Sequence, residues 1–252
     1  MEKLIAGCNI TKSFITGGRK QEVLKSIDLS VDKGEFVSIM GASGSGKSTL
    51  LYALSGMDRM DDGVIIFGQE NMTALSDNAL SDLRRKYMGF VFQQPTFLKN
   101  LNLLDNIVLP MMRDHRKHRK LLIQRAIDLM KQTGIDSLKS RDITQVSGGQ
   151  LQRAGICRAI MNKPSIIFGD EPTGALNTKT AKEIMDLLSD INKQGTALLL
   201  VTHDAQVAAR SQRVLFIHDG KILQELKLPV YRETEQIQRA ASITAVMQTL
   251  GI

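Results

Sequence analysis

The sequence has 252 residues and a formal net charge of +7, with 42% hydrophobic and 23% charged residues. This length suits one large domain or two small ones, and the composition excludes a disordered or collagen-like chain. The longest purely apolar runs, such as 197–201, are far shorter than the roughly 18 residues that a membrane-spanning helix needs. No apolar stretch follows the basic start as it would in a signal peptide, so we expect a folded chain that stays in the cytosol.

Two cysteines and one cluster of cations are candidates for a metal site and a binding surface. Cys8 and Cys157 have no His or Cys at metal-ligand spacing, so we interpret both as small buried hydrophobic residues. The basic run 113–120 precedes a helical pattern at 121–130, and it is either a solvated helix face or a contact with lipid headgroups or a membrane partner. No aromatic residues are interleaved with these cations, so we expect no nucleic-acid partner.

The predicted elements begin with strands at 4–10, 23–31 and 36–40, the last of which leads into a glycine-rich loop. Apolar residues at helical spacing follow at 50–57. From about 94 to 162 the pattern is helical and β-branched runs are few, which predicts a helical subdomain inserted in a sheet-bearing core.

Two later apolar runs, 166–168 and 198–201, are typical of strands buried on both faces of a parallel sheet. Asp170 and Glu171 follow the first run, and His203 follows the second. Ligands of such sheets bind outside the carboxyl ends of the strands, so we expect these side chains to meet the glycine-rich loop in one crevice.

That loop reads Gly-Ala-Ser-Gly-Ser-Gly-Lys-Ser at 41–48 and satisfies the phosphate-loop pattern G-x-x-x-x-G-K-[ST] between a strand and a helix. Glycines allow backbone N–H groups to approach the phosphates of ATP, and the positive end of the helix dipole adds to the attraction. Lys47 supplies a charge to the β and γ phosphates, and Ser48 offers a hydroxyl to Mg²⁺. The predicted nucleotide-binding residues here are Gly41, Ala42, Ser43, Gly44, Ser45, Gly46, Lys47, Ser48 and Thr49.

The acidic pair adds the groups that ATP hydrolysis needs. Asp170 ends a strand and is the candidate magnesium ligand, while Glu171 is the candidate general base that polarises a water for in-line attack on the γ phosphate. His203 either orients the same phosphate through its imidazole or is a half-exposed residue at a strand end.

A second glycine-containing helix start, Ser147, Gly148, Gly149 and Gln150, precedes a predicted helix at 151–161. With this stretch the sequence resembles the ATP-binding cassette (ABC) ATPases, whose signature is Ser-Gly-Gly-Gln, over about 4–226. The resemblance implies an α/β fold of the phosphate-loop NTPase type with an inserted helical subdomain and a small antiparallel β subdomain. We expect the ABC domain at 1–227 and a C-terminal helical extension at 228–252.

The resemblance also implies roles for particular residues. Two cassettes would pack head to tail, with signature Ser147 of each capping the γ phosphate held by the other. Gln93 would join the metal ligands and sense a permease, Phe14 would stack on adenine, and His203 would be the switch histidine. Asn177 stands where the family usually has Asp and lacks its negative charge, which puts coupling between subunits and turnover in doubt but not nucleotide binding. Phe14 stands where Tyr is commoner; it keeps the stacking face and loses the hydroxyl.

Among ABC proteins, a DNA-repair ATPase would need a long coiled coil between phosphate loop and signature, and no heptads occur there. The chain looks like a transporter subunit with a separate permease, in the macrolide-exporter and lipoprotein-release group. The stretches that carry this likeness are 89–93, 101–110 and 170–176. Three other stretches make the likeness closer still to the transporters that confer resistance to bacitracin and lantibiotics in Gram-positive bacteria. They are 22–25, 34–43 and 249–252.

The resemblance therefore implies a homodimer that binds ATP and Mg²⁺ and lies peripherally on the cytoplasmic side of the cell membrane. Lipoprotein or lipid release, macrolide-type export and cell-division regulation remain alternative functions. The extension has apolar residues at helical spacing over 237–250, which pack either on the cassette's own core or against the second cassette or the permease.

Overall fold

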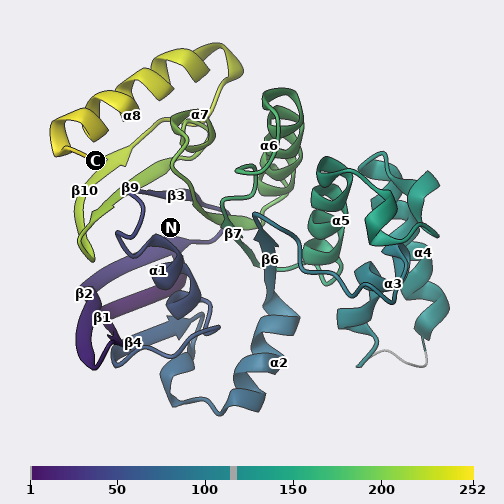
Figure 1. The fold of residues 1–252 in the computed structure, drawn as a ribbon, viewed down its shortest axis with the longest axis horizontal. Helices are drawn as coiled ribbons and strands as arrows, with labels where there is room; N and C mark the ends of the chain where they lie inside the picture. The colour runs from purple at the N-terminus through teal and green to yellow at the C-terminus, as the bar shows by residue number, and fades with distance from the viewer. Residues whose placement is uncertain (1, 114–117) are drawn as a thin grey trace.

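The computed structural model describes residues 2–113 and 118–252. Two sheets form its frame, one of four strands in the order β2-β1-β4-β5 and one of six in the order β10-β9-β3-β8-β7-β6. Figure 1 shows the six-stranded sheet in the middle of the molecule, the four-stranded sheet beside it, and a separate group of helices at one end. This arrangement confirms the predicted α/β class with a small antiparallel part and an inserted helical part.

The four-stranded sheet is antiparallel and opens with a long hairpin. Strands β1 (Lys3–Thr16) and β2 (Arg19–Asp32) are longer than the predicted 4–10 and 23–31. Gly17 and Gly18 both have positive φ, the conformation of a tight hairpin turn, so the two strands pair up to that turn. The sheet is completed by β4 (Asp62–Phe67) and β5 (Glu70–Asn71).

The six-stranded sheet carries the predicted buried strands. Strands β3 (Phe36–Met40) and β8 (Ala197–Val201) pair in parallel and are buried at every residue, as their apolar runs indicate. The remaining strands are β6 (Met88–Phe92), β7 (Ile166–Asp170), β9 (Arg213–His218) and the antiparallel edge strand β10 (Lys221–Lys227). Because β3, β8 and β7 are neighbours and parallel, their carboxyl ends meet at one edge.

Helices surround this sheet and form the group at the end of the molecule in Figure 1. Helix α1 (Lys47–Leu54) follows β3 and ends before Met57, which is 46% exposed, so the predicted extension of this helix to 57 is wrong. The others in the sheet-bearing part are α2 (Asp77–Tyr87), α6 (Thr178–Lys193) and α7 (Ala205–Ala208). The separate group consists of α3 (Leu103–Val108), α4 (Arg119–Gln132) and α5 (Gly148–Ile160), which share an apolar core of their own.

The two cysteines differ in burial. Cys157 on α5 is buried beside Thr133, and burial raises the pKa of its thiol to about 11. The prediction that Cys8 is buried is wrong, because Cys8 lies opposite exposed Val64 on the outward face of the antiparallel sheet. The adjacent Asn9 has a φ of 53°, and the register of β1 shifts there, so alternation along the strand does not continue.

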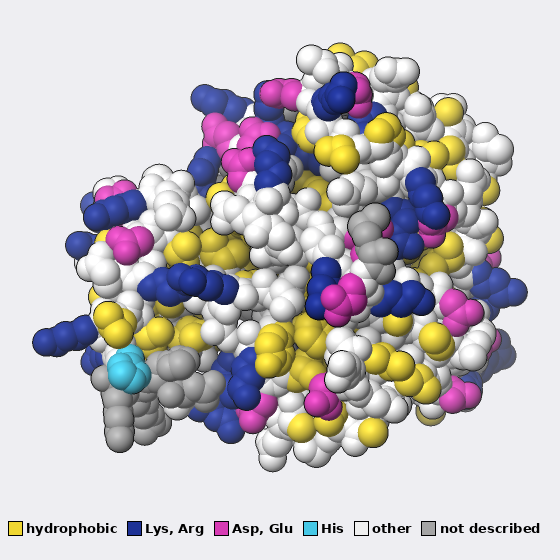
Figure 2. Space-filling view, turned by 180° about the vertical axis from the view of Figure 1, so that it is seen from behind, with side chains coloured by type: hydrophobic (Ala, Val, Ile, Leu, Met, Phe, Trp, Pro, Cys, Tyr) yellow, Lys and Arg dark blue, Asp and Glu magenta, His cyan; other side chains and the backbone are white. Residues whose placement is uncertain are grey.

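The basic run 113–120 lies in part outside the described residues, which leave out 114–117. Arg119 and Lys120 begin α4 and are exposed. On the face shown in Figure 2, the Lys and Arg side chains of the described residues are interspersed with acidic ones. The two interpretations of the run, a solvated helix face or a contact with lipid headgroups or a membrane partner, stay predictions.

The C-terminal extension forms helix α8 (Gln236–Leu250), which packs over β9 and α7. Ala240 and Ile243 are buried there, whereas Ile237 is 81% exposed, so part of the apolar spacing faces away from the cassette's own core. Arg239 is also buried, and its guanidinium donates to the backbone carbonyls of Ala209, Ser211 and Pro229 at 2.6, 2.6 and 2.8 Å. These bonds satisfy a buried charge and fix the helix to the loops beneath it.

Candidate functional site

The glycine-rich loop joins β3 to α1 and has the backbone that its sequence predicts. Gly44 and Gly46 have φ values of 79° and 101°, a region that side-chain-bearing residues rarely adopt. Gly46 is the residue before α1, and no side chain caps the helix there. The first N–H groups of α1 therefore point out of the helix without a side-chain acceptor, as in a phosphate-binding loop.

Lys47 is held inside this loop. Its Nζ donates to the carbonyl oxygens of Gly41 at 2.9 Å and Ala42 at 2.7 Å. Burial lowers the pKa of Lys47, and the nearby charges of Glu171 and Asp170 act in the opposite direction. The ammonium is thus partly desolvated and placed among backbone groups, where a phosphate would gain much from its charge.

Asp170 ends β7, and its carboxylate accepts hydrogen bonds from two hydroxyls of α1. Its Oδ1 accepts from Ser48 Oγ at 2.8 Å, and its Oδ2 accepts from Tyr52 OH at 2.6 Å. Burial and the bond to Asp170 raise the pKa of Tyr52, which keeps the phenol protonated and able to donate. The sequence analysis missed Tyr52, although Ser48 and Tyr52 are four residues apart on a helix and hence on one face.

Glu171 follows in an uncommon backbone conformation, with a φ of 46°. Its N–H donates to Val201 O at 2.9 Å, and its Oε1 lies 3.1 Å from Nδ1 of His203. A non-glycine residue in the left-handed region costs free energy and is common at functional sites. This turn of the backbone directs Glu171 to the same edge as His203 rather than along the strand.

Gln93 and Glu171 both lie against Gly174. A Cβ at Gly174 would lie 2.9 Å from Gln93 Nε2 and 3.1 Å from Glu171 Oε2, so only a glycine leaves room there for both side chains. Buried Gln152 ties the same two segments together, because its Nε2 donates to the carbonyls of Phe92 and Pro172 at 2.9 and 2.7 Å. Neither Gly174 nor Gln152 was predicted as part of the site.

The phosphate loop opens onto a cavity of about 770 Å³, within the usual size range for a small-molecule site. It brings together Phe14 and most of the loop with Glu171 and His203. The cavity is also lined by Met247 and Ile252 of the C-terminal extension, which the sequence analysis did not assign to the site. The full lining is Phe14, Val23, Gly41, Ala42, Ser43, Gly44, Gly46, Lys47, Ser48, Thr49, Glu171, His203, Met247 and Ile252.

The signature residues do not line this cavity. Ser147 caps α5 through its Oγ, which accepts from the N–H of Gln150 at 3.3 Å, while the N–H of Ser147 donates to Gln150 Oε1 at 2.8 Å. Gly149 lies against α6, since a Cβ there would come 2.6 Å from Thr180 Cγ2. The structure therefore separates this second helix start from the phosphate loop of the same chain.

Asn177 caps α6, and its Oδ1 accepts from the N–H of Thr180 at 3.0 Å. Asn and Asp are about equally good at this position of a helix. The local fold therefore tolerates the departure from the family's Asp, and what changes is the charge.

The oxygen atoms at the end of β7 fit magnesium. Asp170 and Ser48 offer a carboxylate and a hydroxyl, the hard ligands that Mg²⁺ takes in nucleotide sites. Within residues 2–113 and 118–252, no group of three or more His, Cys, Asp or Glu side chains could hold a metal ion. A magnesium ion bound here would thus need ligands beyond Asp170 and Ser48, and in nucleotide sites phosphates and water commonly supply several of them.

Similarity to known proteins is extensive. The family described as "ABC transporter" matches residues 24–174, which is more than half of the chain. The chain belongs to the ABC transporter family. It is an ATP-binding subunit of that family, an ATPase coupled to transport whose cofactors are ATP and Mg²⁺. Across the described residues, no helix combines the length and the apolar character that crossing a membrane requires.

Curated ABC relatives include two exporter proteins. The bacitracin export ATP-binding protein BceA of Halalkalibacterium halodurans is 43% identical over 224 residues, which are 88% of this chain and 88% of that protein. The macrolide export ATP-binding/permease protein MacB of Pasteurella multocida is 40% identical over 88% of this chain but only 34% of its own length.

Solved ABC structures agree with the fold. A dimeric ATP-binding cassette in a post-hydrolysis state, bound to ADP and phosphate, is 36% identical with a TM-score of 0.83, over 90% of this chain and 100% of that chain. The structure of cbiO1 of Clostridium perfringens, described as part of the ABC transporter complex cbiONQ, covers 99% of this chain and 96% of its own with a TM-score of 0.80. At 22% identity the second likeness concerns the fold alone.

Proposed function

We propose that this subunit works as a homodimer with a separately encoded permease and that the transporter confers resistance to antimicrobial peptides of the bacitracin and lantibiotic type. The similarity to BceA over most of both chains supports this substrate class. The subunit would lie peripherally on the cytoplasmic side of the membrane, with its ABC domain at 1–227, the helical subdomain at about 94–162 and the extension at 228–252.

The observation that carries the hydrolytic part of this proposal is the cavity shared by the phosphate loop, Glu171 and His203. The loop N–H groups and Lys47 would hold the phosphates of ATP. Glu171 would take the proton of the attacking water, because it is an acid at the cavity wall and lies 3.1 Å from His203. His203 would orient the γ phosphate, and Phe14 would contact the adenine. Gln93, the residue after β6, would reach the phosphates from that strand end.

Magnesium would supply charge neutralisation at the β and γ phosphates. Asp170, Ser48 and Gln93 are the residues that would hold it. Of these, Asp170 and Ser48 already contact each other, so they are placed for a shared ligand.

Replacing Tyr52 with Phe tests the arrangement of Asp170. Loss of the phenol removes the donor to Oδ2 and leaves Asp170 oriented through Ser48 at Oδ1, so the carboxylate is held less firmly. We therefore expect the Mg²⁺ concentration for half-maximal ATPase activity to rise about tenfold. The measurement is a magnesium titration of phosphate release. Tyr87→Phe, at an exposed ring elsewhere, is the matched control and should change nothing. An unchanged magnesium dependence in Tyr52→Phe would show that the hydroxyl does not position Asp170.

The position of the signature supports the dimer. Ser147 lies at a capped helix start that does not reach the cavity of its own chain. A second copy packed head to tail would bring its own Ser147 to the γ phosphate, and the N–H groups of α5 would then face an anion. The 36% identical cassette is itself described as dimeric.

The substrate class is tested in a bacitracin-sensitive Gram-positive host that expresses the chain with the permease encoded beside its gene. We expect the inhibitory concentrations of bacitracin or a lantibiotic to rise, that of a macrolide to stay unchanged, and the effect to vanish with Glu171→Gln. Macrolide resistance instead would favour the second candidate, a macrolide-type exporter, to which the 40% identity with MacB points. No resistance despite copurification with the permease would overturn the peptide proposal.

A further inference from the structure

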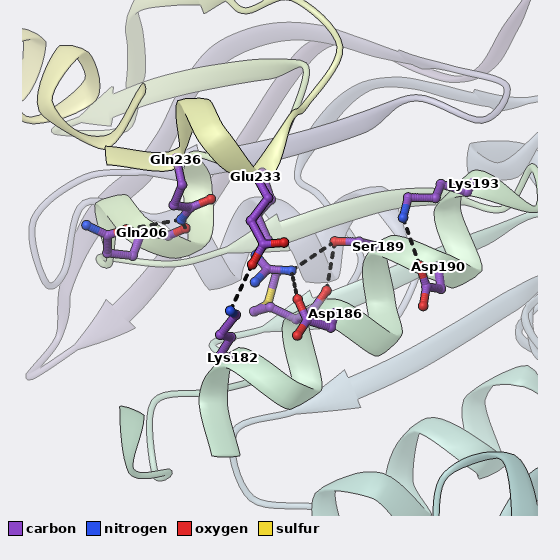
Figure 3. Close-up of polar contacts among 10 residues, drawn as sticks. Lys182, Asp186, Ser189, Asp190, Lys193, Gln206, Glu233 and Gln236 are labelled. Atoms are coloured by element: carbon purple, nitrogen blue, oxygen red, sulfur yellow. Dashed lines mark hydrogen bonds and ion pairs between the residues drawn. The ribbon is translucent and has the colours of Figure 1, made fainter. Parts of the chain in front are cut away.

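The C-terminal extension is attached to the two segments that follow Glu171 and His203 in the chain. Figure 3 shows Glu233 Oε1 paired with Lys182 Nζ of α6 at 2.8 Å, and Gln236 Nε2 donating to the carbonyl of Gln206 at 2.7 Å. Lys182 belongs to the helix that Asn177 caps, and Gln206 follows His203 by three residues. Together with the buried Arg239, these contacts fix the start of α8 to the part of the cassette that carries the site.

The far end of α8 turns toward the phosphate loop. Gly251 caps the helix with a φ of 69°, a left-handed conformation that reverses the chain, and the N–H of Ile252 donates to Met247 O at 3.1 Å. Ile252 is thereby folded back beside Met247. Both side chains pack against the apolar cluster that contains Met40, the last residue of β3 before the loop, and both line the cavity.

The residues that line the cavity are of two chemical kinds. The phosphate loop offers N–H groups and Lys47, whereas the large apolar side chains of the lining are Phe14, Val23, Met247 and Ile252. An alkyl or thioether group set against phosphates would remove their water without replacing its hydrogen bonds, which is unfavourable. Against a purine ring the same groups give favourable dispersion and sulfur–aromatic contacts.

We propose that Met247 and Ile252 form, with Phe14, the apolar wall that contacts the base of the bound nucleotide. The C-terminal extension is then part of the ATP site rather than only a cover for β9. This inference requires ATP binding by the chain but neither the dimer nor the permease, so it stands or falls separately from the proposed transport function.

The test compares a nucleotide with its phosphates alone. Met247→Ala and Ile252→Ala are made in the full chain, and the dissociation constants for ATP and for inorganic tripolyphosphate are measured by calorimetry in the presence of Mg²⁺. Removing one apolar side chain from the contact with the base should weaken ATP binding about fivefold. Tripolyphosphate has no base, so its affinity should be unchanged in both variants.

Leu250→Ala is the matched control, because Leu250 packs against the same apolar cluster on the same helix but does not line the cavity. It should leave both affinities unchanged, and Met247→Leu, which keeps the volume, should bind ATP nearly as tightly as the original. Unchanged ATP affinity in both alanine variants would overturn the proposal. So would tighter ATP binding, which would mean that these residues obstruct the site, or an equal loss for ATP and tripolyphosphate, which would mean that they act through the phosphate loop.

Discussion

Replacing Glu171 with Gln should lower ATP turnover by about 10³-fold while ATP still binds. The amide keeps the shape of the side chain and its place beside His203, but it cannot accept a proton from the attacking water. In the proposed head-to-tail dimer hydrolysis would reopen the closed pair of cassettes, so we expect the ATP-bound dimer to accumulate in this variant. Phosphate release measures the first effect, and size-exclusion chromatography with light scattering in ATP and Mg²⁺ measures the second.

Glu70→Gln provides the matched control, because Glu70 is an exposed residue of β5 in the antiparallel sheet and away from the cavity lining. It should hydrolyse ATP at the original rate. Native turnover in Glu171→Gln would exclude Glu171 as the base. A hydrolysis-deficient variant that loads ATP yet stays monomeric, even with the permease present, would exclude the head-to-tail dimer.

The sequence predicted those parts of the site that depend on local pattern. The phosphate loop is set by glycines at fixed spacing; its flanking strand has the predicted bounds and its helix begins at Lys47 as expected, although it ends before the predicted 57. Asp170, Glu171 and His203 could be placed at one edge because parallel strands that neighbour each other must end together. The loop geometry is thus set by a short stretch of chain, and the common edge by a general rule for parallel sheets.

Contacts between distant segments were not predictable in the same way. Gly174 matters because Gln93 and Glu171 approach from different strands, and no periodicity encodes that meeting. The prediction for Cys8 rested on the general rule that cysteines are buried, but Cys8 pairs with exposed Val64 on the outward face of the antiparallel sheet. Met247 was predicted only as an apolar position of a helix, since its place at the cavity depends on where α8 docks.

Replacing Lys47 with Ala should weaken ATP binding by about 30-fold, equivalent to about 2 kcal/mol. The ammonium is buried against the carbonyls of Gly41 and Ala42, and burial lowers its pKa, so its charge is poorly screened where the phosphates would lie. The loop N–H groups remain in the variant, which is why binding should be weakened rather than abolished. Equilibrium titration with ATP and Mg²⁺ measures the change.

Lys131→Ala removes an exposed cation from α4 and should leave the affinity for ATP as it was. The comparison separates a direct contact from the general attraction of a chain with a net charge of +7, because both variants lower that charge by the same amount. Equal weakening in the two would mean that the overall field, not Lys47, attracts the nucleotide. If ATP affinity is unchanged in Lys47→Ala, the phosphates bind somewhere other than this loop, and the roles assigned to Glu171 and His203 in the same cavity lose their basis.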